Sequence, residues 1–130
     1  GEIIGKCLNL DKQPGMCAKE PMTADGIVRL SKIEVYPQHL DEYMKYATEV
    51  GEVSLRTEPG VLTMYAVSEK ENSCKVTILE TYASREAYEK HIASEHFQKY
   101  KQGTLHMVKS LVLADQTSLN PANKINNFIQ

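Results

Sequence analysis

The segment from residue 75 to residue 100, KVTILETYASREAYEKHIASEHFQKY, constrains the fold most, because it joins a strand directly to a helix. Val76, Ile78, Glu80 and Tyr82 alternate with the residues of the opposite face, which is the two-residue period of a β-strand. The pattern places a carboxylate and a phenol beside two aliphatic side chains on one face. Because a buried carboxylate is unfavourable without a partner, this face is a candidate functional site.

Two serines divide the region after this strand into two predicted helices. Ser84 is expected to cap a helix that carries His91, and Ser94 a second helix that carries His96, since a serine hydroxyl accepts hydrogen bonds from first-turn amides. Even on one continuous helix, residues five positions apart would point about 140° away from each other. This spacing argues against the two histidines as metal ligands on one helix face, and no metal site is predicted.

The apolar pattern of the whole chain predicts a ferredoxin-like plan. Beside the strand at 75–82 and the split helix, it indicates strands at 27–36, 61–67 and 108–113 and a helix from Pro37 to about Thr57. The order strand, helix, strand, strand, helix, strand is a duplicated βαβ pattern. We therefore predict an α+β protein with a four-stranded antiparallel sheet and its helices on one face.

Apolar residues occur on both faces of the strands at 27–36 and 61–67. Helices on one side of the sheet would leave the other apolar face in water, which is unfavourable at roughly 25 cal/mol per Å². A second copy that packs sheet to sheet is the economical solution, so we expect a homodimer.

Three segments are expected along the 130-residue chain, which suits a single domain. Residues 1–26 are interpreted as a polar N-terminal extension with at most local structure, residues 27–114 as the domain, and residues 115–130 as a C-terminal arm. The chain begins with Gly1, which suggests a tag remnant or a cleaved targeting segment and slightly favours a periplasmic or secreted protein over a cytoplasmic one.

Charge and motifs exclude several classes of function. Fifteen Lys and Arg residues against seventeen Asp and Glu give a net charge of −2 without a basic tract, so neither nucleic acid nor a membrane surface is an expected partner. No G-x-G-x-x-G motif or P-loop is present, so no nucleotide cofactor is indicated. The cysteines, Cys7, Cys17 and Cys74, match no zinc ribbon or CxxC motif; Cys7 and Cys17 are free thiols or one disulfide.

Residues 79–100, LETYASREAYEKHIASEHFQKY, resemble the signature of the antibiotic biosynthesis monooxygenase family. These are small dimeric α+β barrel proteins that include cofactor-independent quinol monooxygenases. The family pattern is a strand with a Glu and an aromatic residue, a helix with an Ala and a His, and then a Ser, a His and a Phe. The matching residues here are Glu80, Tyr82, Ala87, His91, Ser94, His96 and Phe97. The segment EPGVLTMYAV at 58–67 also resembles the family's E-x-G-x-x-x-Y/F pattern.

The resemblance implies a cofactor-independent monooxygenase that acts on a quinol or a similar small electron-rich aromatic, with dioxygen as the second substrate. One imidazole would take a proton from the substrate while the other binds its oxygen. The candidate catalytic residues are His96, His91 and Glu80, and the candidate substrate-binding residues are Tyr65, Tyr82, Phe97 and Arg29.

Structural roles for the same residues stay open. The histidines could pack at a helix junction, Glu80 could pair with Arg29, and the aromatics could be plain core. At the level of function, the alternatives are a non-catalytic dimer that binds a small ligand, a small-sugar isomerase and a haem-binding or haem-degrading relative. The haem alternative is disfavoured because Lys101 stands where such relatives place an axial His, and the chain has no Trp.

Overall fold

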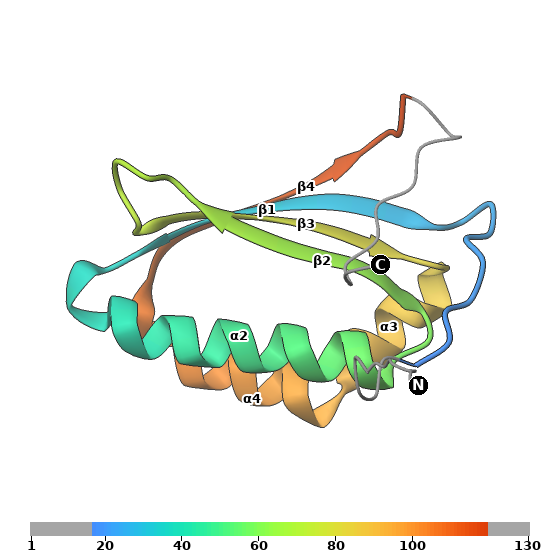
Figure 1. Ribbon diagram of the computed structural model, residues 1–130, viewed down its shortest axis with the longest axis horizontal. Coiled ribbons are helices and arrows are strands. Elements are labelled where there is room, and N and C mark those ends of the chain that lie inside the picture. Colours follow the sequence, from blue (N-terminus) through green and yellow to red (C-terminus); the bar gives the residue numbers. More distant parts are fainter. Residues whose placement is uncertain (1–16, 120–130) are drawn as a thin grey trace, which may run out of the picture.

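The computed structural model describes residues 17–119, and its helices cover one face of a four-stranded antiparallel sheet (Figure 1). The predicted ferredoxin-like α+β architecture is confirmed. In chain order the elements are β1 (Ile27–Val35), η1 (Pro37–His39), α2 (Leu40–Thr57), β2 (Val61–Ser68), β3 (Lys75–Tyr82), α3 (Arg85–Ala93), α4 (Glu95–Thr104), η2 (Leu105–Met107) and β4 (Val108–Gln116).

The strand order is β2-β3-β1-β4, so the first strand and the strand that carries Glu80 form the centre of the sheet. Arg29 of β1 lies opposite Glu80 of β3 and opposite Asp115 of β4. The last strand is longer than predicted from the sequence, because its pairing with β1 continues as far as Gln116.

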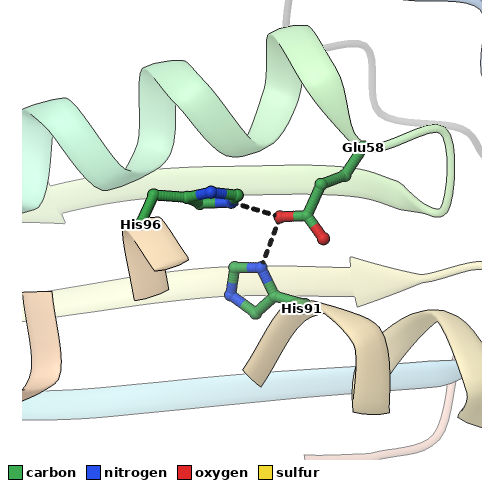
Figure 2. A group of neighbouring side chains, drawn as sticks. All are labelled: Glu58, His91 and His96. Carbon is green, nitrogen blue, oxygen red and sulfur yellow. Dashed lines mark hydrogen bonds and ion pairs between the residues drawn. The ribbon is translucent and has the colours of Figure 1, made fainter. Parts of the chain in front are cut away.

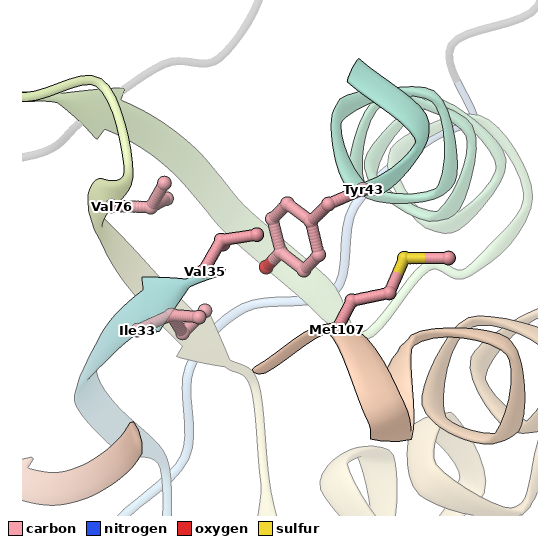
Figure 3. Packing of buried hydrophobic residues seen from close by; sticks show 5 residues of the cluster. All are labelled: Ile33, Val35, Tyr43, Val76 and Met107. Atoms are coloured by element: carbon pink, nitrogen blue, oxygen red, sulfur yellow. The ribbon is translucent and has the colours of Figure 1, made fainter. Parts of the chain in front are cut away.

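The core lies between the sheet and α2. Ile33, Val35 and Val76 point from the sheet toward Tyr43 of α2 and Met107, and all five side chains are buried (Figure 3). The hydroxyl of Tyr43 lies 2.7 Å from that of Tyr100 on α4, so the phenol of a fully buried tyrosine has a hydrogen-bond partner. This contact also joins the two long helices.

Gly103 lies inside the last helix. The helix α4 continues to Thr104, and a Cβ at Gly103 would lie 2.4 Å from the Tyr46 ring of α2. The glycine therefore allows two helices to approach closely, which is a packing role.

The two predicted serine caps are confirmed. The Ser84 hydroxyl accepts from the backbone N–H of Ala87 at 3.0 Å, and the Ser94 hydroxyl accepts from that of Phe97 at 3.2 Å. Ser94 has an extended backbone (φ −68°, ψ 154°), so it ends α3 and starts α4 in a new direction. His91 and His96 consequently lie on different helices.

Residues 17–26 contain no helix or strand, but they lie against the domain. The Lys19 ammonium donates to the carbonyl oxygens of Leu55 and Glu58, at 2.6 and 3.0 Å, and so satisfies acceptors at the C-terminal end of α2. Three backbone hydrogen bonds add to this contact: Cys17 to Arg56, Glu20 to Pro59 and Thr23 to Ala83. The expectations for residues 1–16, including Cys7, and for residues 120–130 lie outside the described residues.

We predict that removal of residues 17–26 destabilises the domain. A chain that begins at residue 27 should melt roughly 4–8 °C below one that begins at residue 17, since the lost charged hydrogen bonds contribute on the order of 1 kcal/mol. Thermal unfolding followed by circular dichroism measures the difference. The Lys19→Met variant of the full chain should show part of the same loss. Equal melting temperatures for the two truncated chains would contradict the docked arrangement.

Candidate active site

The carboxylate of Glu58 lies between the imidazoles of His91 and His96 (Figure 2). Its Oε2 atom is 2.9 Å from Nδ1 of His91 and 2.6 Å from Nε2 of His96. The His91 side chain is 3% exposed, that of Glu58 15% and that of His96 20%. The cluster is thus closed on the His91 side and reaches solvent at Glu58 and His96.

Local sequence explains why these three residues meet. Glu58 follows the last residue of α2, and Pro59 disfavours helical geometry for it, in agreement with its φ of −110° and ψ of 107°. A Cβ at Gly60 would lie 2.3 Å from the Cβ of Ala87, so the glycine lets α3 pack against the start of β2. The close approach of α3 brings His91 to the end of α2.

The charge on Glu58 determines which ring nitrogens of His91 and His96 carry hydrogen. Burial disfavours the charged form of Glu58, but hydrogen bonds from His91 and His96 outweigh burial, so the pKa of Glu58 lies below its ordinary value. An ionised carboxylate only accepts hydrogen bonds. Nδ1 of His91 and Nε2 of His96 must therefore both carry hydrogen and donate to Glu58.

The second ring nitrogen of His91 is available for chemistry. Among residues 17–119, Nε2 of His91 has no hydrogen-bond partner, and the only fully buried side-chain N or O atom without one is Ser54 Oγ. Nε2 of His91 is therefore not fully enclosed by protein, and His91 is one of the residues that line a cavity. The imidazole packs against the rings of Tyr82 and Phe97, with centroid distances of 5.4 and 5.1 Å, which fixes its plane.

A cavity of about 660 Å³ lies between the sheet and the helices, next to His91. Most of its lining is aliphatic or aromatic, from α2, α4 and all four strands. Leu105, Leu111 and Leu113 line it and are more than half exposed, so they mark its mouth between the end of α4 and β4. This size and polarity suit a small organic molecule.

Glu80 lies on the sheet side of this cavity and lines it together with His91, but its carboxylate makes no hydrogen bond to either histidine. Its carboxylate accepts hydrogen bonds from the hydroxyl of Ser31 and, at 2.6 Å, from that of Tyr82. Burial and the neighbouring carboxylate raise the pKa of Tyr82, so this phenol remains a donor. A carboxyl group held by two hydroxyls therefore faces the cavity.

Arg29 also lines the cavity, but it does not form the expected pair with Glu80. Its guanidinium donates to Asp115 and to the Tyr88 hydroxyl, each at 2.8 Å. Burial opposes its charge, yet the hydrogen bonds to Asp115 and Tyr88 raise the pKa of Arg29 above its ordinary value. A cation therefore lies at the β4 side of the cavity.

The expected aromatic wall is present only in part. Tyr82 and Phe97 line the cavity, whereas Tyr65 is 58% exposed and lies on the other face of the sheet, where it pairs with Leu79. His96 is not among the residues that line the cavity. Because side chains alternate along β2, Tyr65 lies on the face away from the cavity. His96 contacts the site through Glu58.

Glu58 is the site residue that sequence reasoning missed. Its signal was the segment EPGVLTMYAV, in which the only acidic residue precedes a proline and a glycine. The strand pattern directed attention to Glu80, because a carboxylate in a strand is visible in the sequence as a break in the apolar face. Glu58 precedes His91 by 33 positions and His96 by 38 positions in the sequence. No short-range residue pattern therefore indicates their contact.

Comparisons with known proteins identify relatives of this chain. The family model described as antibiotic biosynthesis monooxygenase matches residues 26–103. A crystal structure from Bacteriodes thetaiotaomicron VPI-5482, named as a putative antibiotic biosynthesis monooxygenase, is 54% identical, with a TM-score of 0.76 over 78% of this chain and 97% of that one. A search of curated proteins finds no match.

More distant structures share the fold. A putative monooxygenase from Lactobacillus acidophilus NCFM is 26% identical with a TM-score of 0.68, over 73% of this chain and 45% of that one. A putative antibiotic biosynthesis monooxygenase from Nitrosomonas europaea is 14% identical with a TM-score of 0.69, over 78% of this chain and 98% of that one. No helix among residues 17–119 is both long and apolar enough to cross a membrane.

Proposed function

Because this chain belongs to the antibiotic biosynthesis monooxygenase family, we propose that it is a cofactor-independent monooxygenase acting on a hydroquinone or a related small electron-rich aromatic. The family assignment confirms the resemblance of residues 79–100. The observation that carries the proposal is the pairing of His91 with Glu58: one ring nitrogen donates to an ionised carboxylate, and the other has access to an apolar cavity. This is the arrangement of an oriented general base.

The cavity supports the choice of substrate class. Its volume of about 660 Å³ lies within the range of small-molecule sites, and the Phe97 and Tyr82 rings offer faces for an aromatic ring. Glu80, on the sheet side, provides a carboxylate oxygen that can accept from a substrate hydroxyl. A hydroquinone has two hydroxyls, so one can face His91 while the other faces the Glu80 side.

In the proposed reaction His91 removes a phenolic proton through Nε2. The resulting imidazolium is stabilised by Glu58, whose carboxylate already accepts from Nδ1. The electron-rich substrate anion then reduces dioxygen, so the protein supplies a base, hydrogen-bond partners and a site shielded from water. A hydroquinone and one dioxygen give a hydroxyquinone and one water, which places one oxygen atom in each product.

His96 has a positioning role in this scheme. It donates to the same Glu58 oxygen as His91 and lies outside the cavity lining. Its hydrogen bond holds the carboxylate in the position that His91 needs. Loss of His96 should therefore affect the reaction less than loss of His91.

We expect His91→Gln to lower kcat by about 100-fold or more, the range typical of removing a general base. His96→Gln should cost about 10-fold, and His106→Gln, which changes an exposed histidine, serves as the matched control. Oxygen uptake and product analysis on a panel of hydroquinones give the rates, and circular dichroism verifies folding. Wild-type turnover in folded His91→Gln would contradict the assignment. Hydroquinone binding without oxygen uptake by the wild type would show a ligand-binding protein instead.

The uncovered sheet face supports a homodimer. Strand register places Tyr65, Leu79, Leu30 and Ala114 in one row across all four strands. Because the neighbouring Ser31 and Glu80 line the cavity, this row lies on the other face of the sheet, which no helix covers (Figure 1). Nearby on this face Val67 and Val112 are about half exposed. A row that is apolar from one edge of the sheet to the other is complementary to a second copy of itself, since burial stabilises by roughly 25 cal/mol per Å².

Light scattering at micromolar concentration should give twice the chain mass. The double variant Tyr65→Lys and Val112→Lys should shift the protein to monomer, because two charges per chain would be buried at the interface. Leu105→Lys is the matched control, as it changes an exposed leucine on the helix side. A monomeric wild type, or a double variant that remains dimeric, would contradict this interface.

A further inference from the structure

We infer that Glu58, His91 and His96 form a binding site for a divalent transition metal ion, with Zn²⁺ as the best match. Each residue offers one ligand atom, and these three atoms lie within 4.8 Å of one another. Within residues 17–119 no other group of three or more His, Cys, Asp or Glu side chains has this geometry. Two imidazoles and a carboxylate are a ligand set that suits Zn²⁺.

Binding an ion would shift all three side chains, because the facing ring nitrogens of His91 and His96, which lie within 4.8 Å of each other, must also adopt the ligand spacing. Tetrahedral Zn²⁺ with bonds near 2.1 Å has ligand atoms about 3.4 Å apart. The Glu58 oxygen is 2.9 Å from His91 and 2.6 Å from His96, so it would withdraw by roughly 0.5–0.8 Å, within reach of a flexible glutamate side chain. The exposed edge beside His96 leaves room for water as the fourth ligand.

The frame around the ligands is built in advance. They come from the end of α2, from α3 and from α4, and α4 packs on both other helices independently of an ion. The His91 ring is held between Tyr82 and Phe97, and Lys19 fixes the backbone carbonyl of Glu58. The ion would replace the two protons that now bridge the imidazoles and the carboxylate. The sequence argument against a metal site concerned one helix face, and the break at Ser94 removes that objection.

The ion would lie outside the substrate cavity. Only His91 of the three ligands lines the cavity, and it would bind the ion through Nδ1, the nitrogen that faces Glu58 (Figure 2). A neutral imidazole bound through Nδ1 carries its hydrogen on Nε2. One consequence, and only this one, rests on the proposed function. If His91 is the base, the bound ion blocks proton transfer and inhibits turnover.

Calorimetric titration of the full chain with ZnCl₂ tests the site. We expect one ion per chain in the wild type and affinity at least about 100-fold lower in Glu58→Gln and in His96→Gln. The double variant of His39 and His106 to Gln is the matched control, since the half-buried His39 and the exposed His106 form the other histidine pair, with centroids 5.0 Å apart. It should bind like the wild type. Equal affinity in the wild type and both site variants, or no binding by a folded wild type, would overturn the inference.

A second readout separates this inference from the proposed function. Zn²⁺ at one equivalent should raise the melting temperature of the wild type but not of His96→Gln, as expected for a ligand that binds only the folded state. It should also suppress hydroquinone oxidation by the wild type. Binding without suppression would overturn the base role of His91 and leave the metal site standing. Absence of binding with normal turnover would overturn the metal site and leave the base role standing.

Discussion

The hydrogen bonds of the Glu58 carboxylate to two imidazoles are the interaction on which the rest of the site depends. One oxygen joins the end of α2 to α3 and α4, so the three helices converge at a single charged atom. A buried carboxylate without partners would be costly, and the two N–H donors remove that cost. The same bonds determine which nitrogen of His91 remains free, and hence which atom can accept a proton from a molecule in the cavity.

The two carboxylates of the site have different environments. Glu80 belongs to the central sheet, faces the cavity and is held by the hydroxyls of Ser31 and Tyr82. Glu58 lies behind His91 and outside the cavity lining. Glu80 is therefore placed to contact a substrate, whereas Glu58 acts on the substrate only through the imidazole. The separation also explains why an ion bound by Glu58 would affect proton transfer without touching the substrate.

The fold was predictable from the sequence because its signals are local. The alternation in β3, the proline that ends α2 and the two serine caps each act within a few residues, and all are present in the structure. The site was predictable only in part. His91, Tyr82 and Glu80 line the cavity as expected. The partner of the histidines, Glu58, depends on how the end of α2 lies against α3, and such a tertiary contact leaves no periodic pattern in the sequence. The role of Gly103 is likewise a contact between helices, which no local sequence pattern indicates.

The protonation of His91 tests the central claim most directly. In ¹⁵N-labelled protein, correlation of the imidazole nitrogens with the ring carbon-bound hydrogens distinguishes the two neutral tautomers. The account predicts that His91 of the wild type carries its hydrogen on Nδ1 and has an unprotonated Nε2, and that Glu58→Gln weakens this preference. A wild-type His91 with its hydrogen on Nε2 would contradict the account, because that nitrogen could not accept a proton from a molecule in the cavity.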